Sequence, residues 1–252
     1  CPNAVCSSSA WSPDGKLLAY ARRNASEFGA ATLSPPRLWL FDPATGESLP
    51  LFNDNQTLAF EPNWSADGAW ISYVSPNDGG VGVVHLERGE THFYPTISGE
   101  SARWHPTQTR FLYTLFQQQD EQFVAHLIEV DPVSGETHNL SGEQALVEDG
   151  APAWSPDGSW IALRRKVLDG PDSTPGKQIW LLRDDGTAAE ALTRDAGADH
   201  SAPQWSPDGR YLLFHKLPLK GPEITLSVWI LDVETGTSWK VAEPGQRPQW
   251  MP

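Results

Sequence analysis

One eleven-residue pattern recurs along the chain and restricts its possible folds more than any other feature. The copies are WSPDGKLLAYA from Trp11, WSADGAWISYV from Trp64, WHPTQTRFLYT from Trp104, WSPDGSWIALR from Trp154 and WSPDGRYLLFH from Trp205, and a sixth begins at Trp250 in RPQWMP. Successive tryptophans lie 40 to 53 residues apart. Periods of about 40–50 residues are typical of propeller blades or of helical arrays.

The residues between the tryptophans favour strands over helices. Each copy ends in a short run of β-branched and aromatic residues, which is typical of a strand. Turn sequences such as DPATGE at 42–47 combine Pro, Asp and Gly where the chain reverses. With 22 prolines and 21 glycines, long helices are not expected. The sequence therefore predicts an all-β fold with four strands per repeat. The expected third strands of the five repeats are RLWLFD at 37–42, VGVVHL at 81–86, VAHLIEV at 124–130, QIWLLR at 178–183 and SVWILD at 227–232.

Four-stranded antiparallel units with this period are the blades of a β-propeller. In that fold one tryptophan per blade can wedge between adjacent sheets and bury much apolar area. The Ser-Pro-Asp-Gly that follows has turn chemistry, because Pro fixes φ, Asp caps the turn and Gly adopts a positive φ. The copy at Trp104 has Thr107 and Gln108 in place of Asp-Gly, so its turn is expected to differ. The structural repeat residues are thus Trp11, Trp64, Trp104, Trp154, Trp205 and Trp250.

The tandem WSPDG motif resembles the TolB-like or PD40 (WD40-like) β-propeller repeat over nearly the whole chain. The copies at Trp11, Trp154 and Trp205 match fully, whereas the copy at Trp64 has Ala66 in place of Pro. No repeat ends in the Trp-Asp pair of the WD40 repeat. The resemblance implies the fold and leaves the function open, because the family includes periplasmic interaction proteins, sensor modules and gating domains of peptidases.

We expect residues 1–252 to form a single β-propeller domain, and its number of blades has two interpretations. In a six-bladed propeller, which is usual in the family, the three strands missing from the last blade would lie upstream of Cys1 or come from a partner chain. Alternatively, five blades close the ring and the tail packs as an extra strand. An incomplete blade would leave an unpaired edge, which invites association. The complete blades are expected near 9–52, 59–96, 100–141, 150–194 and 201–243, and the partial blade at 245–252.

Strand direction sorts the loops onto two faces. The turns after each tryptophan and between third and fourth strands lie on one face and are short. The opposite face carries the longer connections, so we expect binding there, since a scaffold commonly binds through its loops. The other interpretation is tolerated insertion, because long loops cost little stability. The longer connections are 22–36, 165–177 and 216–226, together with the interblade segments 52–60, 142–150 and 194–200.

The central channel should open on that face beside the residues that precede each first strand. A ring of carboxylates with one histidine could hold a cation or a basic peptide. The alternative is an acidic rim that is merely solvated. The candidate binding residues at this channel mouth are Glu61, Glu100, Asp149, His200 and Arg247.

Charge and cysteine content narrow the partners and the compartment. The net charge of −14 and the sequence pI of about 4.8 disfavour nucleic acid and anionic membrane as partners and favour basic partners or cations. Cys1 and Cys6 are disulfide candidates, which would indicate an oxidising compartment. A cysteine at position 1 also allows a bacterial lipoprotein, but a lipidated Cys1 could not pair with Cys6. No apolar run approaches the ~20 residues of a membrane span, so only a lipid anchor or a larger assembly would hold the chain at a membrane.

Motifs of catalysis are missing from the sequence. It has no G-x-S-x-G elbow, no H-E-x-x-H, no glycine-rich phosphate loop and no CxxC zinc pair. We therefore expect no catalytic residues and no cofactor, a cation in the central channel being the exception, with any metal ligands unknown. The favoured hypothesis is a non-enzymatic bacterial propeller outside the cytoplasm (periplasmic, secreted or cell-surface) that binds a protein partner through its long-loop face. The alternative is a propeller enzyme or gating domain that admits a polysaccharide or peptide to an acidic central funnel.

Overall fold

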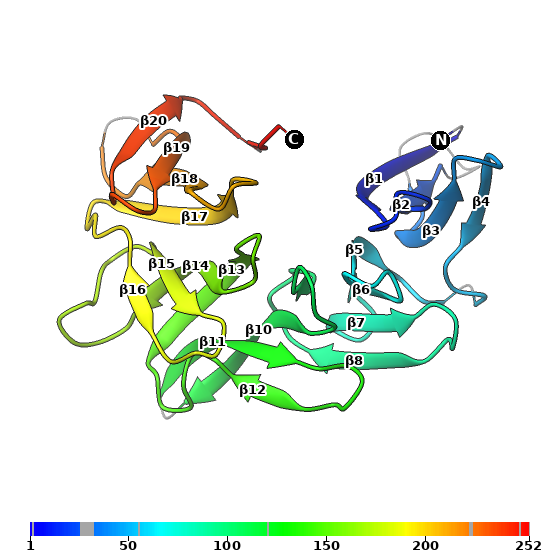
Figure 1. The fold of residues 1–252 in the computed structure, drawn as a ribbon, viewed down its shortest axis with the longest axis horizontal. Coiled ribbons are helices and arrows are strands. Elements are labelled where there is room, and N and C mark those ends of the chain that lie inside the picture. The colour runs from blue at the N-terminus through cyan, green and yellow to red at the C-terminus, as the bar shows by residue number, and fades with distance from the viewer. Residues whose placement is uncertain are drawn as a thin grey trace. The chain divides into compact units, whose positions relative to one another are not determined.

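The computed structural model describes residues 1–252 except 2, 26–32, 55, 120, 222–223, 247 and 252. Every helix or strand element within the described residues is a β-strand, which confirms the all-β expectation (Figure 1). The same residues contain no helix long and apolar enough to cross a membrane. The strands are β1 (Ala4–Trp11), β2 (Leu18–Asn24), β3 (Arg37–Asp42), β4 (Glu47–Pro50), β5 (Phe60–Trp64), β6 (Trp70–Ser75), β7 (Gly80–His85), β8 (Thr91–Pro95), β9 (Arg103–Trp104), β10 (Phe111–Gln119), β11 (Gln122–Val130), β12 (Thr137–Asn139), β13 (Val147–Trp154), β14 (Trp160–Val167), β15 (Gln178–Arg183), β16 (Ala189–Ala191), β17 (Ala198–Trp205), β18 (Tyr211–Pro218), β19 (Ser227–Asp232) and β20 (Ser238–Ala242).

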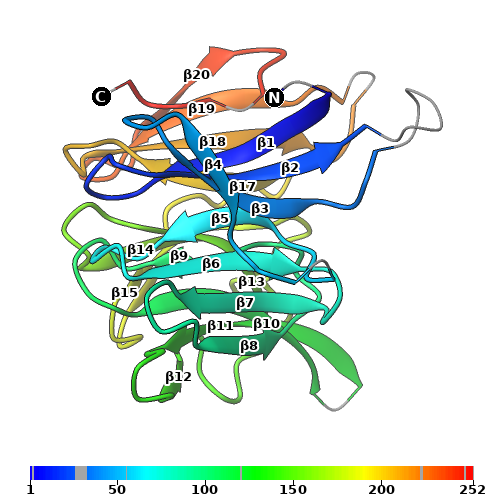
Figure 2. The same ribbon diagram turned by 90° about the vertical axis from the view of Figure 1, so that its right-hand side faces the viewer.

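The strands form five successive four-stranded antiparallel groups, here called blades 1 to 5 (β1–β4, β5–β8, β9–β12, β13–β16 and β17–β20). Within a blade the strands lie side by side in chain order, as β5 to β8 do in Figure 2. A single parallel pair, Ala125 with Glu148, joins blades 3 and 4 into one hydrogen-bonded sheet. The expected third strands coincide with β3, β15 and β19 and lie within two residues of β7 and β11.

The chain divides into two compact units, each described by itself. The first comprises residues 1–113 and 131–135 and contains blades 1 and 2 with β9. The second comprises residues 114–130 and 136–252 and contains blades 4 and 5. Most of blade 3 belongs to the second unit, since the division falls within β10.

Consecutive blades pack through their apolar faces. In the first unit Ala19, Ala21 and Leu38 of blade 1 cluster with Ile71 and Tyr73 of blade 2. The small alanines on the second strand leave room for the large side chains of the next blade. Blades 4 and 5 repeat this arrangement in the second unit, where Ala162, Ile179 and Leu181 meet Leu212, Phe214 and Leu231.

A kink in the first strand recurs in four blades, and the sequence gives no sign of it. Three residues before the repeat tryptophan, a non-glycine residue has a positive φ between 46° and 53°. The pairing of the first and second strands shifts register at the same place, as in a β-bulge. Because residues other than Gly, Asn and Asp rarely adopt this conformation, packing must impose it. The kinked residues are Ser8, Glu61, Ala151 and Ala202.

The two ends of each blade differ in the length of their connections. The short-turn end carries the turn after the repeat tryptophan and the turn between third and fourth strands. The long-loop end carries the connection from second to third strand and the segment that leads to the next blade. Antiparallel pairing within each blade places these two sets of connections at opposite ends. At the long-loop end, residues 168–177 separate β14 from β15, and residues 219–226 separate β18 from β19.

Candidate binding face

The repeat motif builds a hydrogen-bonded turn at the short-turn end. In blade 1 the Ser12 hydroxyl donates to an Asp14 carboxylate oxygen at 2.7 Å and accepts from the Leu17 amide at 2.9 Å. Gly15 has a φ of 70° and donates its amide to the Ser12 carbonyl. The hydrogen bond from Ser12 and then the contacts with Lys16 lower the pKa of Asp14 to about 2. Asp67, Asp157 and Asp208 accept the same hydrogen bond from the serine of their own repeats, so the motif aspartates are engaged in turns, as the sequence predicts.

Blade 3 reverses at the same place with different hydrogen bonds. His105 takes the place of the serine, and its Nδ1 accepts from the amides of Thr107 at 3.2 Å and Gln108 at 3.1 Å. The imidazole thereby accepts from two turn amides in a blade whose motif lacks the aspartate. The expected difference in this turn is therefore one of chemistry, because the chain still reverses between β9 and β10.

The repeat tryptophans attach consecutive blades through their indole nitrogens. Trp64 donates to the Ala10 carbonyl at 3.0 Å, and Trp205 donates to the Ala153 carbonyl at 3.0 Å. Each acceptor immediately precedes the tryptophan of the previous repeat. Trp104 with Asn63 and Trp250 with Gln204 follow the same rule, at 3.2 and 3.1 Å.

Trp11 departs from the expectation that every repeat tryptophan wedges between blades. Its side chain is 54% exposed, although Trp104 at the same repeat position is 9% exposed. Within the first unit, blade 2 packs against Ala19, Ala21 and Leu38 of blade 1, and Trp11 is not part of that cluster.

A buried ion pair occupies the long-loop end of blade 4. Arg165 donates from Nε and from a terminal nitrogen to the two oxygens of Asp149, both at 2.6 Å, and Ser141 donates to the same carboxylate at 2.5 Å. Asp149 is 1% exposed and Arg165 is 6% exposed. Burial alone would lower the pKa of Arg165, but the charge and hydrogen bonds of Asp149 outweigh it and raise that pKa. Asp149 therefore already has a cationic partner inside the chain.

The connection 168–177 ends in contacts with blade 5. The Lys177 amide donates to an Asp199 carboxylate oxygen at 3.0 Å, and the Lys177 carbonyl accepts from the His200 amide at 2.8 Å. The Lys177 ammonium lies 3.3 Å from a Glu148 carboxylate oxygen. These contacts hold the end of the long connection against β17.

His200 is buried beside this connection. It is 2% exposed, and its ring lies 5.5 Å from that of Phe214. Burial lowers the pKa of His200, which favours the neutral imidazole.

Gln178 fixes the segment between blades 4 and 5. Its amide nitrogen donates to the carbonyls of Asp195 at 2.9 Å and Ala198 at 3.2 Å. Its amide oxygen accepts from the Thr193 hydroxyl at 3.0 Å and from the Asp195 amide at 2.9 Å. Because this side chain is buried and satisfied on both sides, it restrains residues 192–197.

Large apolar side chains are exposed in long-loop-end segments of both units. Ile97 lies in the segment between blades 2 and 3, Phe123 at the start of β11, and Ile224 in the connection 219–226. Their side chains are 81%, 72% and 62% exposed. At the short-turn end, Val133 between β11 and β12 is 70% exposed. Sequence reasoning named the loops but not these residues, because an isolated apolar residue in a loop carries no signal of its exposure.

The structure places the channel-mouth candidates in different surroundings. Glu61 is exposed on the kink of β5, and Glu100 is half-buried before β9. These two belong to the first unit, whereas the buried Asp149 and His200 belong to the second. Arg247 lies outside the described residues. Within the part of the chain that the structure describes, no group of three or more His, Cys, Asp or Glu could hold a metal ion.

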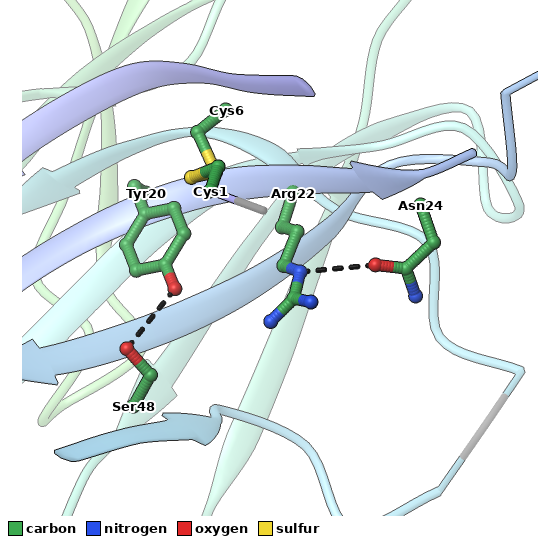
Figure 3. The surroundings of a disulfide bond; sticks show 6 residues. All are labelled: Cys1, Cys6, Tyr20, Arg22, Asn24 and Ser48. Atoms are coloured by element: carbon green, nitrogen blue, oxygen red, sulfur yellow. Dashed lines mark hydrogen bonds between the residues drawn. A yellow bond between two sulfur atoms is a disulfide. The ribbon is translucent and has the colours of Figure 1, made fainter. Parts of the chain in front are cut away.

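Cys1 and Cys6 form a disulfide on blade 1 (Figure 3), with 6.2 Å between their Cα atoms. Nearby, the Tyr20 hydroxyl donates to the Ser48 hydroxyl at 3.2 Å. A lipid on the Cys1 sulfur would be incompatible with this bond.

These features define the class of fold: an all-β propeller of four-stranded antiparallel blades. A putative TolB from Agrobacterium tumefaciens matches 95% of this chain and 81% of its own, with a TM-score of 0.63 and 20% identity. An oligogalacturonate lyase in complex with manganese matches 96% of this chain and 68% of its own, with a TM-score of 0.66 and 19% identity. At these identities the likeness shows the fold alone.

Sequence comparison adds one relative of known source. The chain is 23% identical over 209 residues to the uncharacterized peptidase YuxL of Bacillus subtilis (strain 168). The match covers 68% of this chain and 31% of that relative, so the chain spans about a third of its length. No family model matches the chain.

Proposed function

We propose that this chain is a non-enzymatic β-propeller that works outside the cytoplasm and binds a protein partner through the long-loop ends of its blades. The observation that carries the proposal is the exposure of Ile97, Phe123 and Ile224 at those ends. Aromatic side chains such as Phe123 are enriched at the buried centre of protein–protein interfaces.

The hydrogen-bonded segments at the long-loop end of the second unit favour binding without large rearrangement. Lys177 binds the end of the connection 168–177 to β17, and Gln178 binds the interblade segment at Asp195. A surface ordered in advance loses less conformational entropy on association, so more of the contact energy becomes affinity. The net charge of −14 favours a basic partner, whose encounter would be accelerated by electrostatic attraction.

The disulfide supports a location outside the cytoplasm. Cys1 and Cys6 are bonded to each other, and such bonds persist mainly in oxidising compartments. Lipidation of Cys1 is the competing proposal for the same sulfur. Mass spectrometry of the mature N-terminal peptide separates the two, because only the lipoprotein carries acyl groups and a free Cys6.

The alternative is an enzyme or the gating domain of one, with a peptide or polysaccharide as substrate. It is supported by the similarity to a relative named as a peptidase and to a solved lyase. In this alternative Glu61, Glu100, His200 and Arg247 would contact the substrate or a cation at the channel mouth. Asp149 is the weakest member of that set, because its carboxylate is bound by Arg165.

A capture experiment with matched variants tests the proposal. Phe123 and Val133 are almost equally exposed. Phe123 lies at the start of β11, at the long-loop end, whereas Val133 follows β11, at the short-turn end. Affinity capture of tagged protein from native extract should recover a specific partner with the parent and with Val133→Asp. The variant Phe123→Asp should lose it. Recovery of the protein alone, together with turnover of a glycan or peptide by the purified chain, would refute the scaffold.

A further inference from the structure

The turns after the repeat tryptophans of blades 4 and 5 pack against each other at the short-turn end. A Cβ added at Gly209 would lie 3.6 Å from Cδ of Pro156, so the glycine of one turn contacts the proline of the turn before it. In the first unit a Cβ at Gly68 would lie at the same 3.6 Å from Cδ of Pro13. This contact is part of the repeat, and in each unit a cleft opens beside it between the two blades.

The cleft between blades 4 and 5 has an aromatic and apolar interior. Its volume is about 490 Å³, within the ~300–1,000 Å³ that is usual for ligand sites. Trp160, Leu181, Trp205 and Val233 line it, and all four pack in the cluster between the two blades. The Trp205 indole is also held by its hydrogen bond to the Ala153 carbonyl. The interior is therefore ordered by the packing of the blades.

Three carboxylates complete the lining of this cleft. Asp157 and Asp208 come from the two turns, and the exposed Glu190 comes from β16. Glu190 pairs with Leu181, so it shares the sheet face that packs on blade 5. Asp208 uses Oδ1 for its turn. Among the described residues, Oδ2 of Asp208 and the whole Glu190 carboxylate have no hydrogen-bond or ion-pair partner, so both can receive a donor.

The cleft between blades 1 and 2 shows that the repeat does not require this lining. Leu17 stands there at the repeat position of Trp160. Asp14 has a cation inside the chain, since the Lys16 ammonium lies 3.0 Å from its carboxylate. The second turn carboxylate, Asp67, accepts a further hydrogen bond through Oδ2 at 2.9 Å. The second indole and the open carboxylate oxygens between blades 4 and 5 are therefore additions to the fold.

Two arginines lie near the cleft between blades 4 and 5, and both are already engaged. The Arg183 guanidinium lies 4.7 Å from the centre of the Trp160 ring, its cross-strand neighbour. The Arg210 guanidinium lies 3.0 Å from an Asp232 carboxylate oxygen. In the described part of the chain neither forms an ion pair with the three carboxylates of the cleft. The stacking of Arg183 also shows that the Trp160 ring is suited to a guanidinium.

We propose that the cleft between blades 4 and 5 binds an arginine side chain of a basic polypeptide, at a site separate from the long-loop ends. The aliphatic part of that side chain packs against Trp205 and Leu181. Its guanidinium lies against the Trp160 ring and donates to Glu190 and to Oδ2 of Asp208. Arginine suits the cleft better than lysine, because a planar guanidinium stacks on an aromatic ring while it bonds to two carboxylates. The net charge of −14 attracts such a polypeptide.

Titration of the chain with the blocked peptide Gly-Arg-Gly tests this site by nuclear magnetic resonance. The readout is the indole N–H resonance of Trp205, which the variant Trp205→Phe assigns. The control peptide is Gly-citrulline-Gly, because citrulline keeps the shape of arginine but lacks its charge. We expect a saturable shift of the Trp205 resonance with the arginine peptide and none with the citrulline peptide.

Matched variants separate a built site from general attraction by the net charge. Glu190→Gln and Glu234→Gln each remove one exposed carboxylate, but Glu234 lies in the turn between β19 and β20 and does not line the cleft. Glu190→Gln should weaken the affinity roughly two- to fivefold. Trp160→Leu, which installs the residue that blade 1 has at this position, should weaken it by roughly the same factor. Glu234→Gln should leave it unchanged.

Three results would overturn the proposal: no saturable shift of Trp205, equal affinity for the citrulline peptide, or equal weakening by the two glutamate variants. Unchanged affinity in Glu190→Gln would also overturn it, and that variant alters only an exposed side chain, so the test does not depend on how Trp160→Leu folds. Phe123→Asp should bind the arginine peptide as the parent does. Failure of this site is thereby distinguishable from failure of binding at the long-loop ends.

Discussion

The substitution Trp205→Ala tests whether the repeat tryptophans hold consecutive blades together. The indole packs in the cluster between blades 4 and 5 and donates to the Ala153 carbonyl at 3.0 Å. Removing a fully buried aromatic side chain costs about 3–5 kcal/mol of unfolding free energy, and because Trp205 is half-buried we expect the lower end of that range. The unpaired Ala153 carbonyl adds roughly 1 kcal/mol. Trp205→Phe keeps most of the apolar contact, so it should lose only about 1–2 kcal/mol.

Denaturation by urea, followed by far-UV circular dichroism, measures these losses without using the altered tryptophan fluorescence. The matched control is Trp11→Ala, at the same motif position but 54% exposed, where we expect a loss under about 1 kcal/mol in residues 1–252. Equal losses at positions 11 and 205 would refute the reasoning, because exposure would then have no bearing on the role of the ring.

Three further predictions concern the kink, the buried ion pair and acid stability. Ala202→Gly should stabilise the chain by about 0.5–1 kcal/mol, because glycine relieves the φ of 50°, whereas Ala153→Gly in regular strand should destabilise it by a similar amount in the same urea titration. Asp149→Asn should cost about 3–5 kcal/mol, since it leaves the buried Arg165 unpaired; a thermal scan showing an unchanged Tm would contradict that. The lowered pKa of Asp14 means that its contribution is present above the unfolded value near ~3.9 and is lost as pH falls towards about 2. The midpoint of denaturation should therefore fall over that window, and less steeply in Asp14→Asn; parallel curves would count against the turn as its source.

The sequence predicted the fold because its signals are local and repeated. The turn after Trp205 needs Ser, Asp and Gly at fixed offsets, and the structure contains those hydrogen bonds. The runs that became β15 and β19 are apolar enough to be read as buried strands.

Other features depend on residues far apart in the chain and could not be predicted. Asp149 reads as a free carboxylate at a channel mouth, but Arg165 reaches it from the next strand. The kink at Ala202 has no sequence signal, since alanine has no preference for a positive φ. Trp11 carries the same motif as Trp205, and only the surrounding blades distinguish an exposed ring from a packed one.

The central claim is that the long-loop ends of the blades bind a protein partner. Hydrogen–deuterium exchange of the chain, with and without the captured partner, tests it most directly. The account predicts slower exchange on binding in residues 168–177 and 219–226, and unchanged exchange in the turns 155–159 and 206–210. Protection confined to those turns, or no protection at either end, would contradict it.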